Sequence, residues 1–168
     1  MVGLRKGRCY REIERPYTRR SKYKKKNFIK SIPTNKIVKF ELGNLKKDFE
    51  SSADLVARQS VQIRHNSLES VRLLVNRRLH KFLGNNYKLR LRVYPHHILR
   101  ENKMLTGAGA DRMQSGMQKA FGRPIGLAAQ VKEQQPIFTV YVDNKDLEFA
   151  RETLKKAFSR LPCTCKVV

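Results

Sequence analysis

The sequence lacks the features that would make it a membrane or secreted protein. No apolar run reaches the roughly 18 residues that a membrane-spanning helix needs. The charged N-terminus is not followed by the apolar stretch of a signal peptide. We therefore expect no membrane segment and no leader.

Cysteine is scarce as well. Cys9, Cys163 and Cys165 make an odd number, and the last two lack the two-residue spacing of zinc knuckles. The adjacent His96 and His97 face opposite ways in an extended chain, so they cannot chelate one metal ion. The sequence predicts reduced thiols, no metal and no cofactor.

The common catalytic motifs are also missing. Gly107 is followed five residues later by Arg112, so no phosphate-binding Walker loop forms, and the Gly107-Ala-Gly109 run lacks the third glycine of a dinucleotide-binding turn. No serine-hydrolase elbow and no His-Glu-x-x-His motif occurs. We expect a protein that is not an enzyme. A small enzyme that uses the glycine-rich stretch on a phosphorylated substrate stays as an alternative.

Acidic residues are few, with 14 Asp and Glu against 37 Lys and Arg, which gives a net charge of +23. Such a chain repels itself unless a polyanion neutralises it. Nucleic acid, an anionic membrane surface and acidic protein are the candidate partners. At 168 residues the chain is long enough for one domain with a real core.

Residues 1–30 concentrate the charge, with 12 basic and 2 acidic side chains. Tyr17, Tyr23 and Phe28 alternate with the cations, while aliphatic residues are nearly absent. A disordered tail is one interpretation; an arm that becomes ordered on RNA, with rings and guanidinium planes stacked on bases, is favoured. The predicted contacts in this arm are Arg5, Arg8, Arg11, Arg15, Arg19, Arg20, Lys22, Lys24, Lys25 and Lys26.

From residue 36 onward the pattern is that of a folded domain. β-branched and aromatic residues predict strands over 36–43, 55–66, 87–95, 125–131, 136–142 and 163–168. Apolar residues at spacings of three or four predict two helices, one from an Asn66 cap to Gly84 and one from an Asn144 cap to Pro162. We expect an α+β fold over 31–168, a two-layer sandwich of two helices on a mixed, mostly antiparallel sheet.

The strand predicted over 87–95 has one apolar and one basic face. Tyr87, Leu89, Leu91 and Val93 alternate with three cations. Like charges in a row repel, so this face favours a bound anion. The basic segment that follows extends the predicted contacts, which are Lys88, Arg90, Arg92, His96, His97 and Arg100. A structural role for one of the two histidines is an equal alternative.

The stretch "KMLTGAGADRMQSGMQKAFGRP" (103–124) is a long loop with glycines, small residues and sparse charge. Loops of this length are usually functional or disordered. Glycine frees the backbone and alanine permits close approach to a surface. We predict an internal loop at about 103–118 that projects as a finger into another molecule.

Three stretches carry a resemblance to a known family. "RCYR", "RVYPHHILRENKML" and "GAGADRMQSGMQKAFGRPIG" resemble the universal large-subunit ribosomal protein family, called L-sixteen in bacteria and, in the closer archaeal and eukaryotic branch, L-ten-e. The similarity runs from Arg8 to Val168. The sequence lacks the long C-terminal extension of the eukaryotic members, and in this it resembles the archaeal members.

The resemblance implies a hammerhead-like sandwich that binds large-subunit rRNA in the cytoplasmic ribosome, beside the A-site tRNA. Neighbouring ribosomal proteins and assembly factors would be its further partners, and it would not form a homo-oligomer. Residues 106–118 would form the internal loop that approaches the peptidyl-transferase centre. The protein would join late in subunit assembly and help tRNA to be accommodated. The implied residues for tRNA and the active centre are Lys103, Thr106, Gly107, Gly109, Asp111, Arg112, Gln114, Gly116, Lys119 and Arg123.

Two further classes of protein stay as alternatives to a ribosomal one. The same charge suits an extraribosomal RNA-binding protein or RNA chaperone, although no recognition helix and no RNP motif is present. A protein that binds acidic partners would also carry this charge. It would not explain the aromatic rings in the arm or the long loop.

Overall fold

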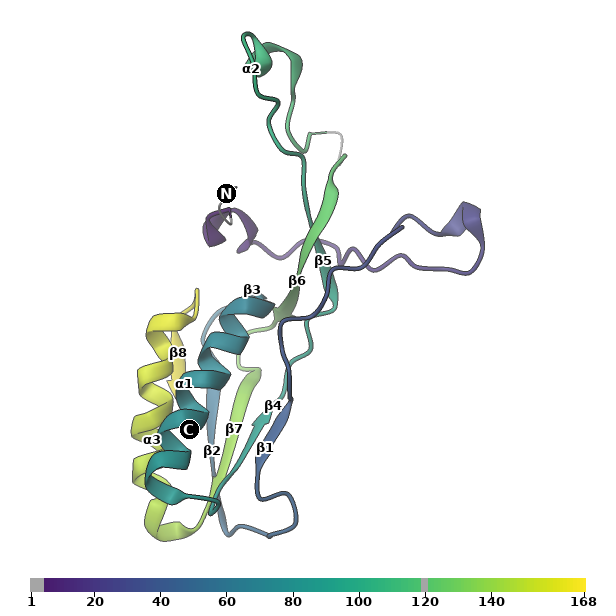
Figure 1. Cartoon of the computed structure of the whole chain (residues 1–168). Helices are drawn as coiled ribbons and strands as arrows, with labels where there is room; N and C mark the ends of the chain where they lie inside the picture. Colours follow the sequence, from purple (N-terminus) through teal and green to yellow (C-terminus); the bar gives the residue numbers. More distant parts are fainter. Residues whose placement is uncertain (1–4, 119–120) are drawn as a thin grey trace.

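The computed structural model describes residues 5–118 and 121–168, and Figure 1 shows the whole chain. Two long helices lie in it, α1 (His65–Leu83) and α3 (Leu147–Lys156), with a short α2 (Ala110–Met113). The strands are β1 (Glu41–Gly43), β2 (Ser51–Ala57), β3 (Val61–Arg64), β4 (Lys88–Leu91), β5 (His97–Glu101), β6 (Arg123–Val131), β7 (Pro136–Val142) and β8 (Cys165–Val167).

The strands form two sheets. One is five-stranded with the order β1-β4-β7-β2-β8, and the other is three-stranded with the order β3-β6-β5. Every pairing among the described strands is antiparallel. Since β6 and β7 belong to different sheets, the turn between them joins the two parts of the molecule.

The main core lies between the two long helices and the five-stranded sheet. Figure 1 shows α1 and α3 side by side on one face of that sheet. Leu68, Val71, Val75 and Leu79 of α1 are fully buried at spacings of three or four, and Phe138 of β7 lies opposite them in the same core. The predicted α+β sandwich of two helices on a sheet is confirmed.

Both predicted helix caps are wrong. The first helix begins at His65, and the Asn66 side chain accepts a hydrogen bond only from the neighbouring Ser67 amide at 2.9 Å. Asn144 lies in a 3₁₀ turn ahead of α3, where its side chain bonds Glu50 (2.8 Å) and Ser51. Asn66 is therefore the second residue of the helix, one past the Arg64 N-cap position, and the Asn144 side chain bonds another segment, so neither residue is the N-cap.

Two strand predictions need correction. The segment predicted over 55–66 is two strands, β2 and β3, which turn apart at 58–60 and enter different sheets. The strand predicted over 36–43 is regular only at β1, although the Leu91 amide still donates to the Phe40 carbonyl at 2.8 Å. In both places the backbone partners, not the local composition, determine where the strand ends.

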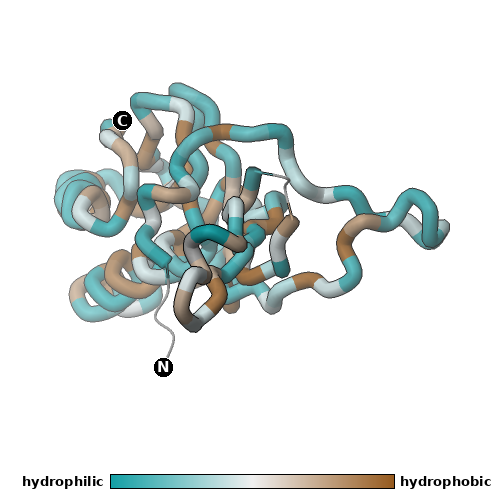
Figure 2. The backbone as a smooth tube through the Cα atoms, turned by 90° about the horizontal axis from the view of Figure 1, so that it is seen from above, coloured by the Kyte–Doolittle hydropathy of each residue, from teal (hydrophilic) through white to brown (hydrophobic). Residues whose placement is uncertain are grey.

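The three-stranded sheet carries the projecting parts of the molecule. Residues 102–118, which follow β5, project beyond the sheet and carry α2, and the segment around residues 18–28 projects separately to the right in Figure 1. Figure 2 shows this second projection as a mostly hydrophilic tube that extends away from the body. Both projections are therefore available for contact with another molecule.

Candidate nucleic-acid interface

The first part of the arm is bonded to the three-stranded sheet. The Gln62 amide donates to the Arg11 carbonyl at 2.9 Å, and the Ile98 amide donates to the Tyr17 carbonyl at 3.2 Å. Ile29, at the end of the arm, is buried in a small cluster with Ile98. The arm thus adds to the sheet near residues 11–17 and again at Ile29, and the segment between 18 and 28 projects away from it.

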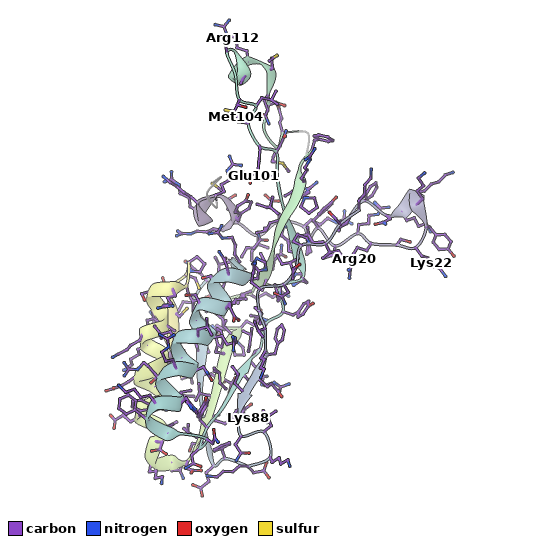
Figure 3. All side chains as sticks on the ribbon, viewed as in Figure 1. Arg20, Lys22, Lys88, Glu101, Met104 and Arg112 are labelled. Atoms are coloured by element: carbon purple, nitrogen blue, oxygen red, sulfur yellow. The ribbon has the colours of Figure 1, made fainter. Side chains whose placement is uncertain are left out.

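That segment carries cations packed on aromatic rings. The Arg19 guanidinium lies 4.4 Å from the centre of the Phe28 ring. Lys22 and Lys26 lie over Tyr23 at 5.5 and 5.8 Å. Figure 3 shows Arg20 and Lys22 on this projection. The predicted alternation of rings and cations is present, but the rings are already covered by charges of the same segment.

A groove of about 1510 Å³ lies between the arm and the base of the finger. The Arg100 guanidinium lies 3.9 Å from the centre of the Tyr17 ring at its wall. Basic side chains from both sides outnumber the acidic Glu12, Glu14 and Glu101, and the predicted residues brought together here are Arg5, Arg8, Arg15, Arg19, His97, Arg100, Gln114 and Gly116. Positive charge beside aromatic rings is the composition of a groove for RNA.

His97 connects the groove to the arm. Its ring is buried, and its Nδ1 accepts a hydrogen bond from the Tyr17 amide at 2.8 Å, which requires an unprotonated nitrogen. Burial, together with the charges of His96 and Arg100, lowers the pKa of His97 from 6.5 to about 4. Of the two roles considered for the histidines, the structure gives His97 the structural one and leaves His96 exposed.

We expect acid to loosen this anchor. Because the folded protein lowers the pKa of His97 below the unfolded value, its contribution to the free energy of unfolding is complete above pH 6.5 and is lost as the pH falls toward 4. The difference amounts to roughly 3 kcal/mol. Urea unfolding at a series of pH values should show this loss. His97→Gln, which keeps a hydrogen-bond acceptor but cannot titrate, should flatten the curve.

A second buried histidine also contributes to the expected loss of stability in acid. His65 accepts a bond from the Lys36 amide at 3.3 Å, and burial with the charges of Lys36 and Arg64 lowers its pKa as well. Some loss of stability therefore persists in His97→Gln. His80→Gln, at the exposed far end of α1, is the matched control. If it flattens the curve as much as His97→Gln does, the anchor is not the cause.

The basic strand face lies elsewhere, on the five-stranded sheet. Arg90 and Arg92 are exposed while Leu89 and Leu91 are buried, as the alternation predicted. Lys88 lies near the lower end of the sheet in Figure 3, away from the groove and the finger. The Arg90 Nε lies 3.1 Å from a Glu41 carboxylate oxygen. This ion pair removes part of the repulsion from which a bound anion was inferred.

The finger is held together by two side-chain amides. Gln114 donates to the Lys103 carbonyl at 2.6 Å and accepts from the Leu105 amide at 2.7 Å. Asn102 donates to the Gly116 carbonyl at 2.9 Å. These bonds join the outgoing and returning limbs, so the loop predicted at 103–118 is an ordered hairpin-like finger in this structure.

The tip of the finger is exposed and partly apolar. Figure 3 places Arg112 at the far end and Met104 nearer the sheet. Met104 and Met113 are 68% and 73% exposed. Gly109 has a left-handed backbone (φ 73°) at the start of α2, which glycine adopts without strain. Other predicted residues lie as follows: Thr106 and Gly107 before α2, Asp111 within it, Arg123 at the start of β6, and Lys119 outside the described residues.

Several residues that hold the arm were missed from the sequence. Arg64 donates to the Arg5 carbonyl at 2.8 Å, Gln130 to the Glu14 carbonyl at 2.7 Å, and Gln62 to the Tyr10 carbonyl at 3.0 Å. These bonds join positions more than fifty residues apart and give no local pattern. The exposed Tyr94 was also missed, although it continues the alternation of the basic strand.

The described residues hold neither a membrane-spanning helix nor a cluster of metal ligands. No described helix is long and apolar enough to cross a membrane. Within residues 5–118 and 121–168, no group of three or more potential ligands could hold a metal ion. The buried Cys163 and Cys165 sulfurs lie 3.5 Å apart as free thiols, and Cys9 is exposed. The groove, the finger and the basic face are thus the candidate functional surfaces.

Comparison with known proteins gives a consistent result. The family model described as ribosomal protein L16p/L10e matches residues 18–168. The large ribosomal subunit protein uL16 of Staphylothermus marinus is 47% identical over 98% of this chain and 92% of its own length. The proteins of the same name from Archaeoglobus fulgidus and Picrophilus torridus are 44% identical (96% of this chain, 90% of theirs) and 49% identical (87% and 84%).

Proposed function

The chain belongs to the ribosomal protein L16p/L10e family, and from this premise we propose that it binds large-subunit rRNA beside the A-site tRNA and the peptidyl-transferase centre. The family consists of structural ribosomal proteins, which makes the chain a constituent of the ribosome and not an enzyme. Its place is the large ribosomal subunit, as the names of its archaeal relatives indicate.

The groove between the arm and the finger is the observation that supports rRNA binding. Cations of the arm and of β5 face the same space of about 1510 Å³. Phosphate contacts from arginine and lysine fix the position of a protein on RNA without reading its sequence. The arm therefore holds the body on rRNA, and neighbouring ribosomal proteins and late assembly factors are its other proposed partners.

The finger supports the second half of the proposal. Its limbs are bridged by Gln114 and Asn102 before any partner is bound. A preformed projection loses less conformational entropy on binding than a disordered loop does. Its few charges and exposed methionines suit close approach to tRNA at the active centre better than they suit phosphate binding. We assign to it the support of tRNA accommodation.

Stoichiometry on washed ribosomes tests the proposal. A tagged copy expressed in an archaeal host should co-sediment with large subunits after a high-salt wash, at about one copy per subunit. An extraribosomal RNA chaperone, bound mainly by charge, should be removed by the same salt because such binding weakens steeply with ionic strength. A copy number far below that of a resident subunit protein, measured by mass spectrometry, would contradict the proposal.

A further inference from the structure

The exposed side of the segment 88–96 extends beyond the basic strand. Arg92, Tyr94 and His96 are exposed, and the two residues between them, Val93 and Pro95, are buried. Two residues of extended chain span about 6.6 Å. An aromatic ring thus lies between two nitrogen-bearing side chains on one side of the chain, within the length of a nucleotide or two.

Tyr94 is held in place by a second ring. It stacks on Phe40, with ring centres 5.5 Å apart and planes inclined by 22°. Phe40 packs against the main core, whereas Tyr94 is 61% exposed. One face of the Tyr94 ring is therefore supported by the protein, and the other is open to solvent.

This ring differs from the aromatic residues of the arm. Phe28 and Tyr23 are covered by arginine or lysine of their own segment, whereas no cation lies over Tyr94 within the described residues. The nearby carboxylate of Glu41 is paired with Arg90 at 3.1 Å. The surroundings of Tyr94 are thus basic, with the exposed Lys39 and Arg92 close in sequence to the two stacked rings.

We propose that Tyr94 is a stacking platform for one unpaired nucleobase of RNA, and that Arg92 contacts an adjacent phosphate. The proposal rests on the proposed function, since it takes rRNA as the partner. It adds a second binding site, on the connection between β4 and β5, apart from the residues that line the groove. Proteins recognise unstacked bases by stacking them on aromatic side chains, and a preformed ring loses little entropy in doing so.

The probe is the large-subunit particle washed free of this protein, to which purified variants are added back. Tyr94→Ala should bind about 5- to 150-fold more weakly, the equivalent of about 1–3 kcal/mol for one stacked base. Stacking releases no counterions, so the slope of log affinity against log salt should not change. One base that the wild-type protein protects from dimethyl sulfate should become reactive.

Three matched variants separate stacking from packing and charge. Tyr94→Phe should bind like the wild type, because it keeps the ring. Tyr94→Leu, which still packs on Phe40 but has no ring, should lose as much affinity as Tyr94→Ala while its circular dichroism stays unchanged. Arg92→Gln should make the salt slope shallower by about 0.7 to 0.9, as expected for one phosphate contact.

The outcomes distinguish this site from the proposed function. If the wild-type protein does not bind the particles, both proposals fail. If it binds and Tyr94→Leu binds equally well, the stacking site alone is overturned. Lost affinity with every base still protected would mean that Tyr94 contacts a neighbouring protein, which also overturns it.

Discussion

Replacement of residues 107–113 by a short glycine linker is expected to leave the protein folded and incorporated in large subunits, while tRNA accommodation slows by on the order of tenfold or more. A tenfold change corresponds to about 1.4 kcal/mol in the activation free energy. The deletion removes α2 with Arg112 and Met113 but keeps Gln114. The bonds from Gln114 to Lys103 and Leu105 can then still join the limbs.

The fold should survive because the finger contributes nothing to the main cores. Within the described residues, neither apolar cluster includes a side chain from the region 103–118. Shortening a surface loop changes the entropy of loop closure only slightly. Docking should survive because the phosphate contacts proposed for this protein come from the arm and the basic strand.

Two measurements on one strain test this separation of docking from function. Mass spectrometry gives the copy number of the shortened protein in purified subunits, and rapid kinetics gives the rate of tRNA accommodation. A matched variant with Lys24, Lys25 and Lys26 replaced by alanine should show the opposite pattern: weaker incorporation, and a normal rate for the subunits that contain it. Absence of the shortened protein would make the finger an rRNA anchor, and a normal rate would show that it takes no part in accommodation.

Local patterns in the sequence predicted the helix and the strand that bury one face against the core. The spacing of Leu68, Val71, Val75 and Leu79 predicted α1, and the alternation around Leu89 and Leu91 predicted β4. In both, a single face is buried against the core. The period of the apolar residues therefore shows directly in the sequence.

Features that depend on distant partners could not be predicted. The division of 55–66 into β2 and β3 depends on pairing with β7 and β6, which lie much later in the chain. Asn144 failed as a cap because its side chain bonds Glu50, a contact across 94 positions. The anchoring of the arm on His97 and Gln62 is of the same kind. The composition shows that these residues are polar, but it does not show which residues they bond.

The sequence predicted the positive charge of the candidate site but not how its residues are arranged in space. The basic residues of the arm and of β4 were found by counting, and the structure places them on two separate surfaces, around the groove and on the five-stranded sheet. The resemblance supplied the role of the finger. Nothing local indicated that Gln114 bridges its limbs, since an amide side chain in a polar loop has no characteristic pattern.

Gly43→Ala is expected to cost at least roughly 3 kcal/mol of unfolding free energy, a large part of the stability of an ordinary domain. Gly43 ends β1 with φ +88°, and an added Cβ would lie 2.1 Å from the Tyr87 carbonyl oxygen. A left-handed backbone alone costs a non-glycine residue about 1–2 kcal/mol. The rest is lost because that oxygen also accepts the Asn44 amide at 2.8 Å and cannot move away.

Gly126→Ala is the matched control, since it adds the same methyl group to a glycine in a strand. There the new Cβ would lie 3.5 Å from His65 Nε2, an ordinary contact. The free energy of unfolding should change by no more than about 1 kcal/mol. In urea, where the slope is about 1–3 kcal/mol per molar, the midpoint of Gly43→Ala should fall by roughly 1–3 M and that of Gly126→Ala should hardly move.

The same substitution also tests how β1 supports the stacked rings. Phe40 lies just before β1, and its carbonyl accepts the Leu91 amide at 2.8 Å, so displacing β1 from β4 displaces Phe40 from beneath Tyr94. Gly43→Ala should therefore weaken binding to washed particles even below its unfolding midpoint, and Gly126→Ala should not. Equal midpoints for the two variants would show that β1 is free to shift, and that the Tyr87 carbonyl does not fix its position on the sheet.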